Sequence, residues 1–346
     1  MPTTNTELLV LSVRDVEKLV SMRKCIELQE EAFRSVHFNR ALNARNSFLY
    51  MDKHKAYIKL MGCYVEGGES RPTDTLVVKA IDAFEENPRK YGLPVVLGSL
   101  TLFDSNSGLP VCFMDGAYIT ALRTGAAGGL AAKYLAREDT RAIGVIGTGS
   151  TAGFTTKAVL ELLPDIQEVK IFSRSPEHRE NLSKKINASG RVSSAIPVAS
   201  AIEATASVEV IVTGTTSATP VLSPEMVKPG QHVNAMGIKT EIDPRVFPMS
   251  NKIVADSTPI ACSDGKTSVA IGAGAVKESD VYADLGELVC GKKSGRTSAT
   301  EITIFDSSGV AAQDAVLARY VYEEARKAGL GTYVDVFGGL AELLMP

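Results

Sequence analysis

Short apolar runs alternate with amphipathic stretches through the middle of this chain. Five strand-like runs occur there, at 142–146, 168–172, 208–213, 231–236 and 252–255, and the first of them is apolar and β-branched. Helical patterns follow the first two, at about 150–163 and 176–186. Runs that are largely apolar are typical of strands buried on both faces of a parallel sheet. The alternation therefore predicts an α/β fold with a doubly wound parallel sheet.

The residues before this region have a different pattern. Strand-like segments occur at 8–13, 56–61, 75–80, 95–104 and 109–114, and one amphipathic helix is predicted over 15–35. A last amphipathic helix, predicted over 317–327, is expected to cross back to this region. We therefore expect a discontinuous α+β domain, residues 1–124 completed by 312–346, beside a nucleotide-binding domain of residues 125–311.

A glycine turn directly follows the apolar run that ends at Ile146. Its spacing is G-x-G-x-x-A, in which the first glycine permits a tight turn, the second lets the backbone approach a pyrophosphate, and the small third residue lets the helix pack on the strand. The amides at the start of that helix are suited to bind phosphate. Strand, turn and helix in this order predict a Rossmann-type domain. The cofactor-binding candidates of the turn are Gly147, Thr148, Gly149, Ser150, Thr151 and Ala152.

The end of the second predicted strand distinguishes NAD from NADP. NAD sites carry an acidic residue there, whereas NADP sites place an arginine near the added phosphate. This chain has Ser173, Arg174 and Ser175, and no carboxylate before Glu177. A guanidinium flanked by two hydroxyls suits a phosphate, although a solvated loop arginine is the alternative interpretation. NADP(H) is favoured as the cofactor, with NAD(H) as the other candidate.

Composition narrows the class of protein. A chain of 346 residues is long enough for two domains, and 45% apolar with 22% charged residues is ordinary for a globular enzyme. A net charge of −3 offers no general attraction to nucleic acid or to an anionic membrane, and no apolar run approaches the length of a membrane span. The five cysteines lack C-x-x-C spacing, so we expect reduced thiols and no metal site. These features predict a cytoplasmic globular enzyme.

A cationic cluster precedes the glycine turn. Thr120, Arg123 and Thr124 are expected to open a helix whose next residues, 126–132, are small. Because a helix N-terminus favours anions, a cation placed there suggests that Arg123 binds an anion such as a carboxylate. An arginine paired with a structural carboxylate is an equally good interpretation of this fragment alone. The small residues predict close packing of this helix against the nucleotide sheet.

Seven motifs in register resemble the ornithine cyclodeaminase and mu-crystallin family over nearly the whole chain. They are Arg45 after the first helix, Lys79 in Leu76-Val-Val-Lys, Tyr91-Gly-Leu-Pro-Val-Val-Leu-Gly, Thr120-Ala-Leu-Arg-Thr-Gly-Ala-Ala, Gly147-Thr-Gly-Ser-Thr-Ala, Lys228-Pro-Gly-Gln-His-Val-Asn-Ala-Met-Gly and Ile304-Phe-Asp-Ser-Ser-Gly-Val-Ala-Ala-Gln-Asp. The resemblance implies a homodimer whose first domain supplies both the dimer interface and an amino-acid pocket.

The resemblance also implies that Arg45, Lys79 and Arg123 hold the substrate carboxylate, with Lys79 close to the reacting carbon. Three cations around one anion would orient the substrate towards the nicotinamide. Lys79 lies in an apolar strand, where burial would favour loss of its proton and make it a candidate proton donor. A lysine at the strand edge with its ammonium in water is the alternative interpretation.

Further cofactor neighbours are expected at Thr124, Thr213, Met236 and Ser308. Ser308 and Val310 belong to a segment, starting at Asp306, that resembles the nicotinamide-side turn of the family, although serine and aspartate at a helix start are also ordinary caps. His232 is better interpreted as a core histidine than as a catalytic one.

One departure from the family bears on the reaction. Members that deaminate ornithine carry an aspartate in the loop after the Asn-Ala-Met-Gly turn. Here Lys239 and Glu241 follow Gly237 almost at once and match the end of that loop, so the loop is about four residues shorter and its aspartate has no counterpart. Cyclodeamination needs a general base. The mu-crystallin branch also lacks this aspartate and reduces cyclic ketimines.

The expected function is therefore NAD(P)H-dependent reduction of a cyclic ketimine, of the Δ1-pyrroline-2-carboxylate or Δ1-piperideine-2-carboxylate type, to an L-amino acid. Ornithine or lysine cyclodeamination and amino-acid dehydrogenation are the enzymatic alternatives. A non-catalytic protein that retains NADPH is the third hypothesis.

Overall fold

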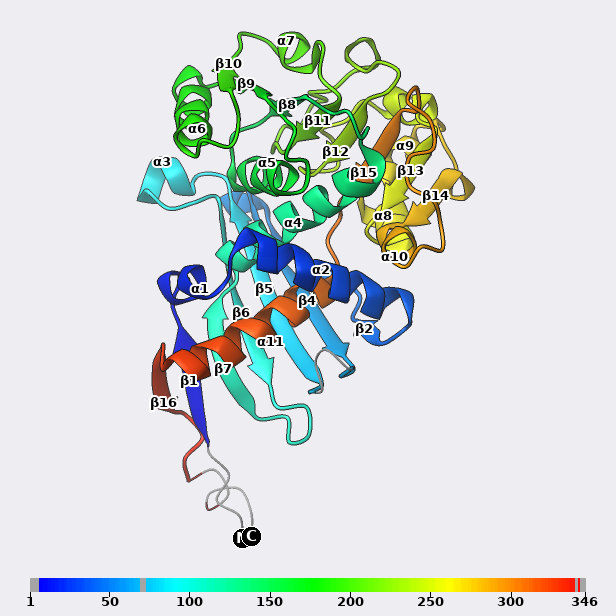
Figure 1. Cartoon of the computed structure of the whole chain (residues 1–346). Coiled ribbons are helices and arrows are strands. Elements are labelled where there is room, and N and C mark those ends of the chain that lie inside the picture. The colour runs from blue at the N-terminus through cyan, green and yellow to red at the C-terminus, as the bar shows by residue number, and fades with distance from the viewer. Residues whose placement is uncertain (1–5, 69–72, 340–341, 343–346) are drawn as a thin grey trace. The chain divides into compact units, whose positions relative to one another are not determined.

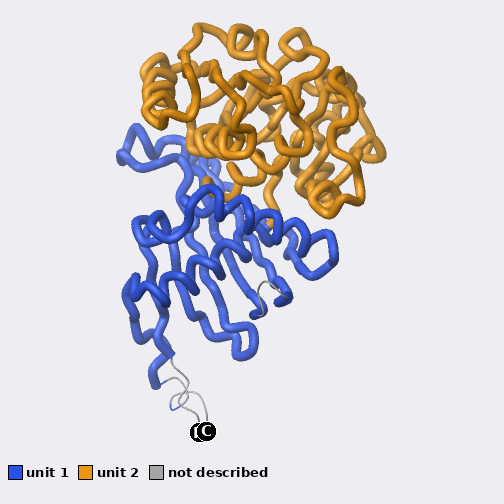
Figure 2. Tube along the Cα trace, viewed as in Figure 1, with its two compact units in different colours: residues 1–120, 311–346 blue, residues 121–310 orange. Residues whose placement is uncertain are grey.

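A computed structural model describes residues 6–68, 73–339 and 342. Contacts between Cα atoms divide the chain into unit 1, residues 1–120 and 311–346, and unit 2, residues 121–310 (Figure 2). The sequence prediction placed these boundaries after residues 124 and 311. Unit 1 is thus built from two separate stretches of the chain.

Unit 1 contains one mixed sheet. Among the described residues its strand order is β16-β1-β7-β6-β5-β4-β2, with β3 paired to β4, and all neighbours are antiparallel except β1 and β7. The strands are β1 (Glu7–Leu11), β2 (Ala41–Asn43), β3 (Ser47–Met51), β4 (Ala56–Val65), β5 (Thr75–Phe84), β6 (Val96–Phe103), β7 (Pro110–Asp115) and β16 (Thr332–Asp335). This is the predicted α+β pattern, to which the structure adds β2, β3 and β16.

Helices cover one face of this sheet. The helices of unit 1 are α1 (Val13–Leu19), α2 (Met22–His37), α3 (Asn87–Tyr91) and α11 (Ala311–Ala328), with the short turn η1 (Asp52–His54). Figure 1 shows α2 and α11 running across the sheet. The prediction of one helix over 15–35 was wrong, because the hydroxyl of Ser21 accepts the Lys24 amide and starts a second helix after the extended residue Val20.

Unit 2 is the predicted doubly wound parallel sheet. Its strand order is β10-β9-β8-β11-β12-β15-β13-β14, and every pair in this order is parallel. The strands are β8 (Ala142–Ile146), β9 (Glu168–Phe172), β10 (Ser194–Pro197), β11 (Val210–Thr213), β12 (His232–Ala235), β13 (Lys252–Ala255), β14 (Val281–Asp284) and β15 (Thr303–Asp306). All residues of β8, β11, β12 and β13 are buried, so both faces of these strands are covered.

The helices of unit 2 lie on both faces of its sheet (Figure 1). They are α5 (Ser150–Leu162), α6 (Pro176–Ala188), α7 (Ala201–Thr205), α8 (Thr258–Asp264), α9 (Lys266–Gly272) and α10 (Leu285–Val289), with the short turns η2 (Pro224–Met226), η3 (Pro244–Met249) and η4 (Glu278–Asp280). Helix α4 (Ala117–Leu135) contains the boundary between the units. None of the helices in the described part of the chain combines the length and the apolar character of a membrane span.

Successive residues of the central strands supply two separate cores. In β8, Ile143 and Val145 pack with α5 and the end of α4, whereas Ala142 and Ile146 belong to the cluster on the opposite face. Side chains alternate between the faces of a strand, so a strand that is apolar throughout must be covered on both sides.

Candidate functional site

The glycine turn after β8 requires its glycine for two reasons. Gly147 has φ +110, which L side chains rarely adopt, and a Cβ atom there would lie 2.5 Å from the carbonyl oxygen of Gly214. Gly214 is also closely packed, because a Cβ on it would lie 2.9 Å from the methyl group of Ala152. The turn therefore packs directly on the segment that follows β11.

Gly149 leaves room at the start of α5. It is the N-cap residue, with φ −72, and no described atom lies within 4 Å of the Cβ that another residue would carry there. No side chain in the described part of the chain caps α5. Open space before the first-turn amides is the geometry that a pyrophosphate needs, so Gly149, Ser150 and Thr151 fit this group.

Arg174 lies at the same edge of the sheet. The Gly147 amide donates to the carbonyl of Phe172, 2.9 Å away, and so joins the glycine turn to the end of β9. Arg174 is exposed, whereas the hydroxyl of Ser175 accepts the His178 amide at 3.3 Å as the cap of α6. A second cation, Arg179, donates to the Ser173 carbonyl at this corner and was missed by the sequence prediction.

The position of Arg123 in α4 differs from the prediction. The helix begins at Ala117, and Asp115 accepts the Tyr118 amide at 2.7 Å, so the helix N-terminus already has its own anion. Burial raises the pKa of Asp115, while the amides of the first turn lower it. Arg123 lies in the second turn of α4, not the first, so the argument from a misplaced cation at the helix start was wrong.

Arg123 instead lies against the loop after β15. Its side chain is buried, with 5% of the residue exposed. Gly309 has φ +80, and a Cβ atom added to it would lie 2.9 Å from Arg123 Nη1. The amides of Ser308 and Gly309 donate to Oδ2 of Asp256, at 2.7 Å for Ser308. Burial raises the pKa of Asp256 to about 6. The loop on which the guanidinium rests is therefore held by a buried carboxylate.

A second carboxylate supports the same loop. Oδ2 of Asp306 accepts the amide and the hydroxyl of Thr267, at 2.7 and 2.8 Å, and Lys266 Nζ lies 3.5 Å from Oδ1. Lys266 also donates to the Ser307 carbonyl at 2.8 Å. The sequence prediction missed Asp256 and Lys266. The signal for Asp256 was its place directly after an apolar strand, at the sheet edge where ligands bind.

Lys79 is fully buried in unit 1. Its Nζ lies 2.6 Å from Oδ2 of Asp314 in α11, with both side chains at most 1% exposed, and 3.2 Å from the hydroxyl of Thr120. The interpretation as a strand-edge lysine is therefore excluded. The sequence prediction included Asp314 in a family motif but assigned it no role.

Arg45 and Lys79 lie at the same level of this sheet. The amide of Ala44 donates to Gly62 in β4, and the neighbouring Met61 pairs with Lys79 in β5. Two strand spacings correspond to about 10 Å between the backbones. Arg45 is exposed. Since Arg123 belongs to unit 2, convergence of the three cations on one anion stays a prediction.

The short loop after β12 is held by Glu241. This buried carboxylate accepts the hydroxyl of Thr213 at 2.7 Å, the amide and hydroxyl of Thr215 at 2.9 and 3.0 Å, and the amide of Gly237 at 2.6 Å. Because its oxygens are engaged by the loop, Glu241 is not a substitute for the absent aspartate. Lys239 is exposed and lies 3.5 Å from Asp264.

The other predicted residues take the following positions. The hydroxyl of Thr213 is directed to Glu241, Met236 lies beside Gly128, and Thr124 is 9% exposed on α4. A Cβ atom added to Gly265 would lie 2.5 Å from Ser308 Oγ, so Ser308 packs closely on Gly265. Val310 is buried.

His232 is buried in β12, where desolvation lowers its pKa to about 3, and its Nδ1 lies 2.9 Å from Thr303 Oγ1. It is therefore a neutral core residue, as predicted.

The small residues of α4 pack mainly on a helix rather than on the sheet. Cβ atoms built on Gly125 and Gly129 would lie 2.5 Å from the Phe154 backbone and 2.6 Å from the Ala158 methyl group of α5. The sheet contributes Asn234, whose amide group donates to the Gly128 carbonyl at 3.1 Å. Close approach of α4 to α5 is what these positions require.

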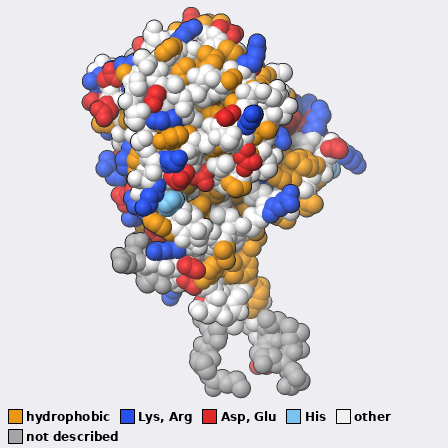
Figure 3. Space-filling model, turned by 90° about the vertical axis from the view of Figure 1, so that its right-hand side faces the viewer, with side chains coloured by type: hydrophobic (Ala, Val, Ile, Leu, Met, Phe, Trp, Pro, Cys, Tyr) orange, Lys and Arg blue, Asp and Glu red, His pale blue; other side chains and the backbone are white. Residues whose placement is uncertain are grey.

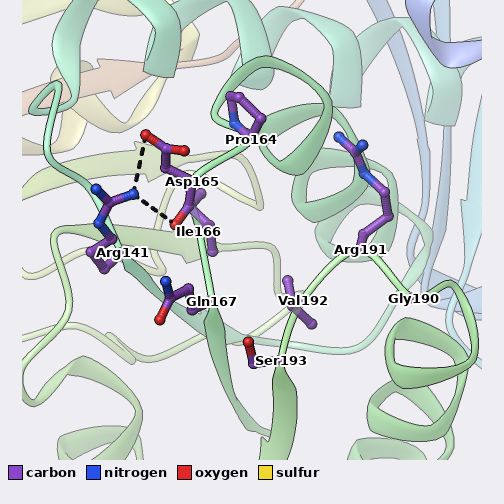
Figure 4. A pocket seen from close by; sticks show the side chains of 9 residues that line it. All are labelled: Arg141, Pro164, Asp165, Ile166, Gln167, Gly190, Arg191, Val192 and Ser193. Atoms are coloured by element: carbon purple, nitrogen blue, oxygen red, sulfur yellow. Dashed lines mark hydrogen bonds and ion pairs between the residues drawn. The ribbon is translucent and has the colours of Figure 1, made fainter.

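A surface hollow of about 350 Å³ lies at the other end of the strands of unit 2. Figure 4 shows the side chains that line it. Its lining includes Arg141, Gln167 and Ser193, which directly precede β8, β9 and β10. Segments before parallel strands lie at the amino edge of the sheet, opposite the edge that binds nucleotides. Arg141 is already engaged there by Asp165, at 3.1 Å. The hollow is not part of the candidate site.

Known proteins are similar to this chain over most of its length. Residues 6–329 match the model of the ornithine cyclodeaminase/mu-crystallin family. The chain belongs to this family. An alanine dehydrogenase of Archaeoglobus fulgidus is 36% identical over 96% of this chain and 99% of its own length, and a Δ1-pyrroline-2-carboxylate reductase of Bacillus cereus is 32% identical over 95% and 100%.

A solved structure of the family has the same fold. The Δ1-pyrroline-2-carboxylate reductase of Thermococcus litoralis, in complex with NADH and L-proline, is 34% identical and covers 94% of this chain and all of its own, with a TM-score of 0.89. The α/β fold and the family membership predicted from the motifs are confirmed.

Proposed function

We propose that this protein is an NAD(P)H-dependent reductase that converts a cyclic ketimine with a neighbouring carboxylate, such as Δ1-pyrroline-2-carboxylate, to an L-amino acid. The observation that carries this proposal is the buried ammonium of Lys79, held by Asp314 and Thr120 at the level of Arg45. A relative of the same fold is solved with NADH and L-proline, the product of such a reduction.

Each group of the site has a defined task in this reaction. Reduced nicotinamide supplies a hydride for the imine carbon when it is bound. Lys79 donates a proton to the imine nitrogen, so that C=N becomes HC–NH and one N–H bond of the ammonium is broken. Arg45 and Arg123 bind the substrate carboxylate and orient the ring. The residues of the 147–152 turn hold the pyrophosphate.

The assay for this function is consumption of NADPH or NADH with Δ1-pyrroline-2-carboxylate or Δ1-piperideine-2-carboxylate, with proline or pipecolate identified as the product. If the protein binds dinucleotide and oxidises none of it with either substrate, the reductase proposal fails and the non-catalytic binding protein is favoured.

Within this proposal the preferred cofactor is NADP(H), and NAD(H) is the alternative, since the structure of the Thermococcus relative is a complex with NADH. Replacing Arg174 by alanine is expected to weaken NADPH binding by roughly 1.5–3 kcal/mol, because a charge-assisted contact with the 2′-phosphate is lost, and to leave NADH binding nearly unchanged. Fluorescence titration of both nucleotides measures the effect. Equal affinity of the unmodified protein for NADH and NADPH would contradict the assignment.

A second candidate function is oxidative deamination of an amino acid, favoured by the alanine dehydrogenase relative. Both reactions transfer hydride at a carbon that carries nitrogen beside a carboxylate. Formation of NADH or NADPH from alanine, together with ammonia and pyruvate, would identify it. Arg45 and Arg123 would bind the substrate carboxylate in either reaction. Assays with alanine and with the cyclic ketimines therefore distinguish the two functions, whereas the residues of the site do not.

The short loop leads to a prediction about cyclodeamination. The unmodified protein is expected to release no ammonia from ornithine or lysine, because Glu241 is engaged by the loop and no carboxylate replaces the family aspartate. Ammonia is measured after incubation with NAD⁺ or NADP⁺. Robust release without net turnover of the cofactor would show that another group serves as the base.

We also propose that unit 1 forms the dimer interface of a cytoplasmic homodimer. Its sheet face opposite to α11 carries exposed apolar side chains, Leu60 in β4, Val78 in β5 and Phe113 in β7, each between 39% and 45% exposed. On the face drawn in Figure 3, cationic and anionic side chains are intermixed.

A further inference from the structure

The Lys79–Asp314 pair joins two residues that are far apart in the sequence. Nζ of Lys79 and Oδ2 of Asp314 are 2.6 Å apart, and the exposed fractions of the two side chains are 1% and 0%. Isolated charges are costly in such surroundings, so each group requires the other. A buried pair of this kind is not needed to stabilise a sheet, since apolar residues of similar volume stabilise cores as well or better.

Asp314 is itself anchored by the start of α11. It lies in the first turn, where the unpaired amides of a helix favour a negative charge. The side-chain oxygen of Asn43 accepts the Ala312 amide at 2.9 Å, and Gln29 donates to the Gln313 carbonyl at 3.3 Å. These contacts hold the carboxylate in place. Asn43 is the last residue of β2 and precedes Arg45 by two residues. The end of β2 therefore supports the start of α11 and leads directly to Arg45, a candidate for binding the substrate carboxylate.

The contacts of Lys79 direct its ammonium. Besides Asp314, the hydroxyl of Thr120 accepts from Nζ at 3.2 Å. Burial raises the pKa of the Cys112 thiol to about 12 and raises the pKa of the Tyr118 and Tyr322 phenols above the ordinary value. Arg319 in α11 is a further cation and donates to the Asp74 carbonyl at 2.7 Å, and the carboxylate of Asp115 accepts the Tyr118 amide. Asp314 is a carboxylate in direct contact with Lys79 Nζ.

We propose that Asp314 is a positioning residue for the reaction: its carboxylate fixes the direction of the Lys79 ammonium and keeps it protonated until the imine nitrogen takes the proton. Asp314 makes no contact with substrate in this scheme. The inference rests on the proposed function, because it assigns Asp314 a role only if Lys79 is the proton donor.

The test is the pH profile of kcat for Asp314→Asn with Δ1-pyrroline-2-carboxylate and NADPH. The amide keeps the size of the side chain but removes the charge, so Lys79 should lose its proton at lower pH. The alkaline limb of the profile is expected to move down by about one to three pH units. At pH 8 kcat should fall by about 10²-fold, with a smaller loss at pH 6, and the Kd of NADPH should not change.

Asp314→Glu is the companion variant if the amide fails to fold. It keeps the charge but displaces it by one methylene, so the alkaline limb should stay in place while kcat falls. Glu301→Gln is the matched control, because Glu301 also pairs with a mostly buried lysine, Lys252, at 3.1 Å, at the amino edge of the other sheet. This control variant should have the kcat of the unmodified enzyme, and the alkaline limb of its pH profile should not move.

Two outcomes separate the failures. If Lys79→Met has the kcat of the unmodified enzyme, the proposed proton donor is wrong. If Lys79→Met is inactive while Asp314→Asn keeps the pH profile of the unmodified enzyme, the inference about Asp314 is overturned and the proposed function stands. A uniform loss at every pH, with an unmoved limb, would show a purely structural role and also overturn the inference.

Discussion

Replacing Lys79 by methionine is expected to lower kcat for ketimine reduction by about 10²- to 10⁴-fold, because the proton donor to the imine nitrogen is lost. Methionine fills a similar volume, so packing in β5 is largely kept. The change leaves Asp314 without its cation, and a loss of stability is expected from the unpaired buried charge. Steady-state kinetics at saturating substrate measures the effect.

NADPH titration is the control for this variant. The phosphate contacts are expected at the 147–152 turn and at Arg174, in unit 2, so the Kd of NADPH should not change. The double variant Lys79→Met/Asp314→Asn removes both charges and should recover stability without recovering kcat. A single variant with unaltered kcat would show that the proton comes from elsewhere.

Replacing Arg123 by lysine is expected to raise KM for the imino acid by about 10- to 100-fold, because lysine keeps the charge but loses the planar pair of donors that fits a carboxylate. The loop beneath the guanidinium provides a second way to disturb the same contact. Gly309 has φ +80, and a Cβ there would lie 2.9 Å from Arg123 Nη1. Gly309→Ala should therefore raise KM in the same direction.

The Arg123→Lys and Gly309→Ala variants are both measured by the dependence of rate on imino-acid concentration at saturating NADPH. Arg141→Lys is a matched control, since Arg141 lies at the amino edge of the sheet beside Asp165 and should not affect KM. Retention of the original kcat/KM by Arg123→Lys and Gly309→Ala together would place the carboxylate elsewhere.

Local pattern was sufficient for the nucleotide-binding half of the fold. The runs at 142–146, 168–172 and 252–255 are strands with the predicted bounds. Every residue of 142–146 and 252–255 is buried, as expected for strands covered on both faces, whereas Glu168 and Lys170 of the second run are only partly buried. Pattern was insufficient where capping competes with periodicity. The hydrophobic stripe over 15–35 continues through Ser21, but the side chain of this serine starts a new helix.

The sequence alone determined the family, the parallel sheet and the glycine turn, since each strand run, turn and motif is a short local pattern and the motifs occur in the family's order. It also identified Lys79 and Arg123 as residues of interest, although it misplaced Arg123 in its helix. Only the tertiary structure decided what these side chains contact. Lys79 pairs with Asp314, 235 residues away, and Arg123 lies against Gly309, which Asp256 holds from a third segment. Such contacts depend on which strands and helices become neighbours, and no local periodicity records that choice.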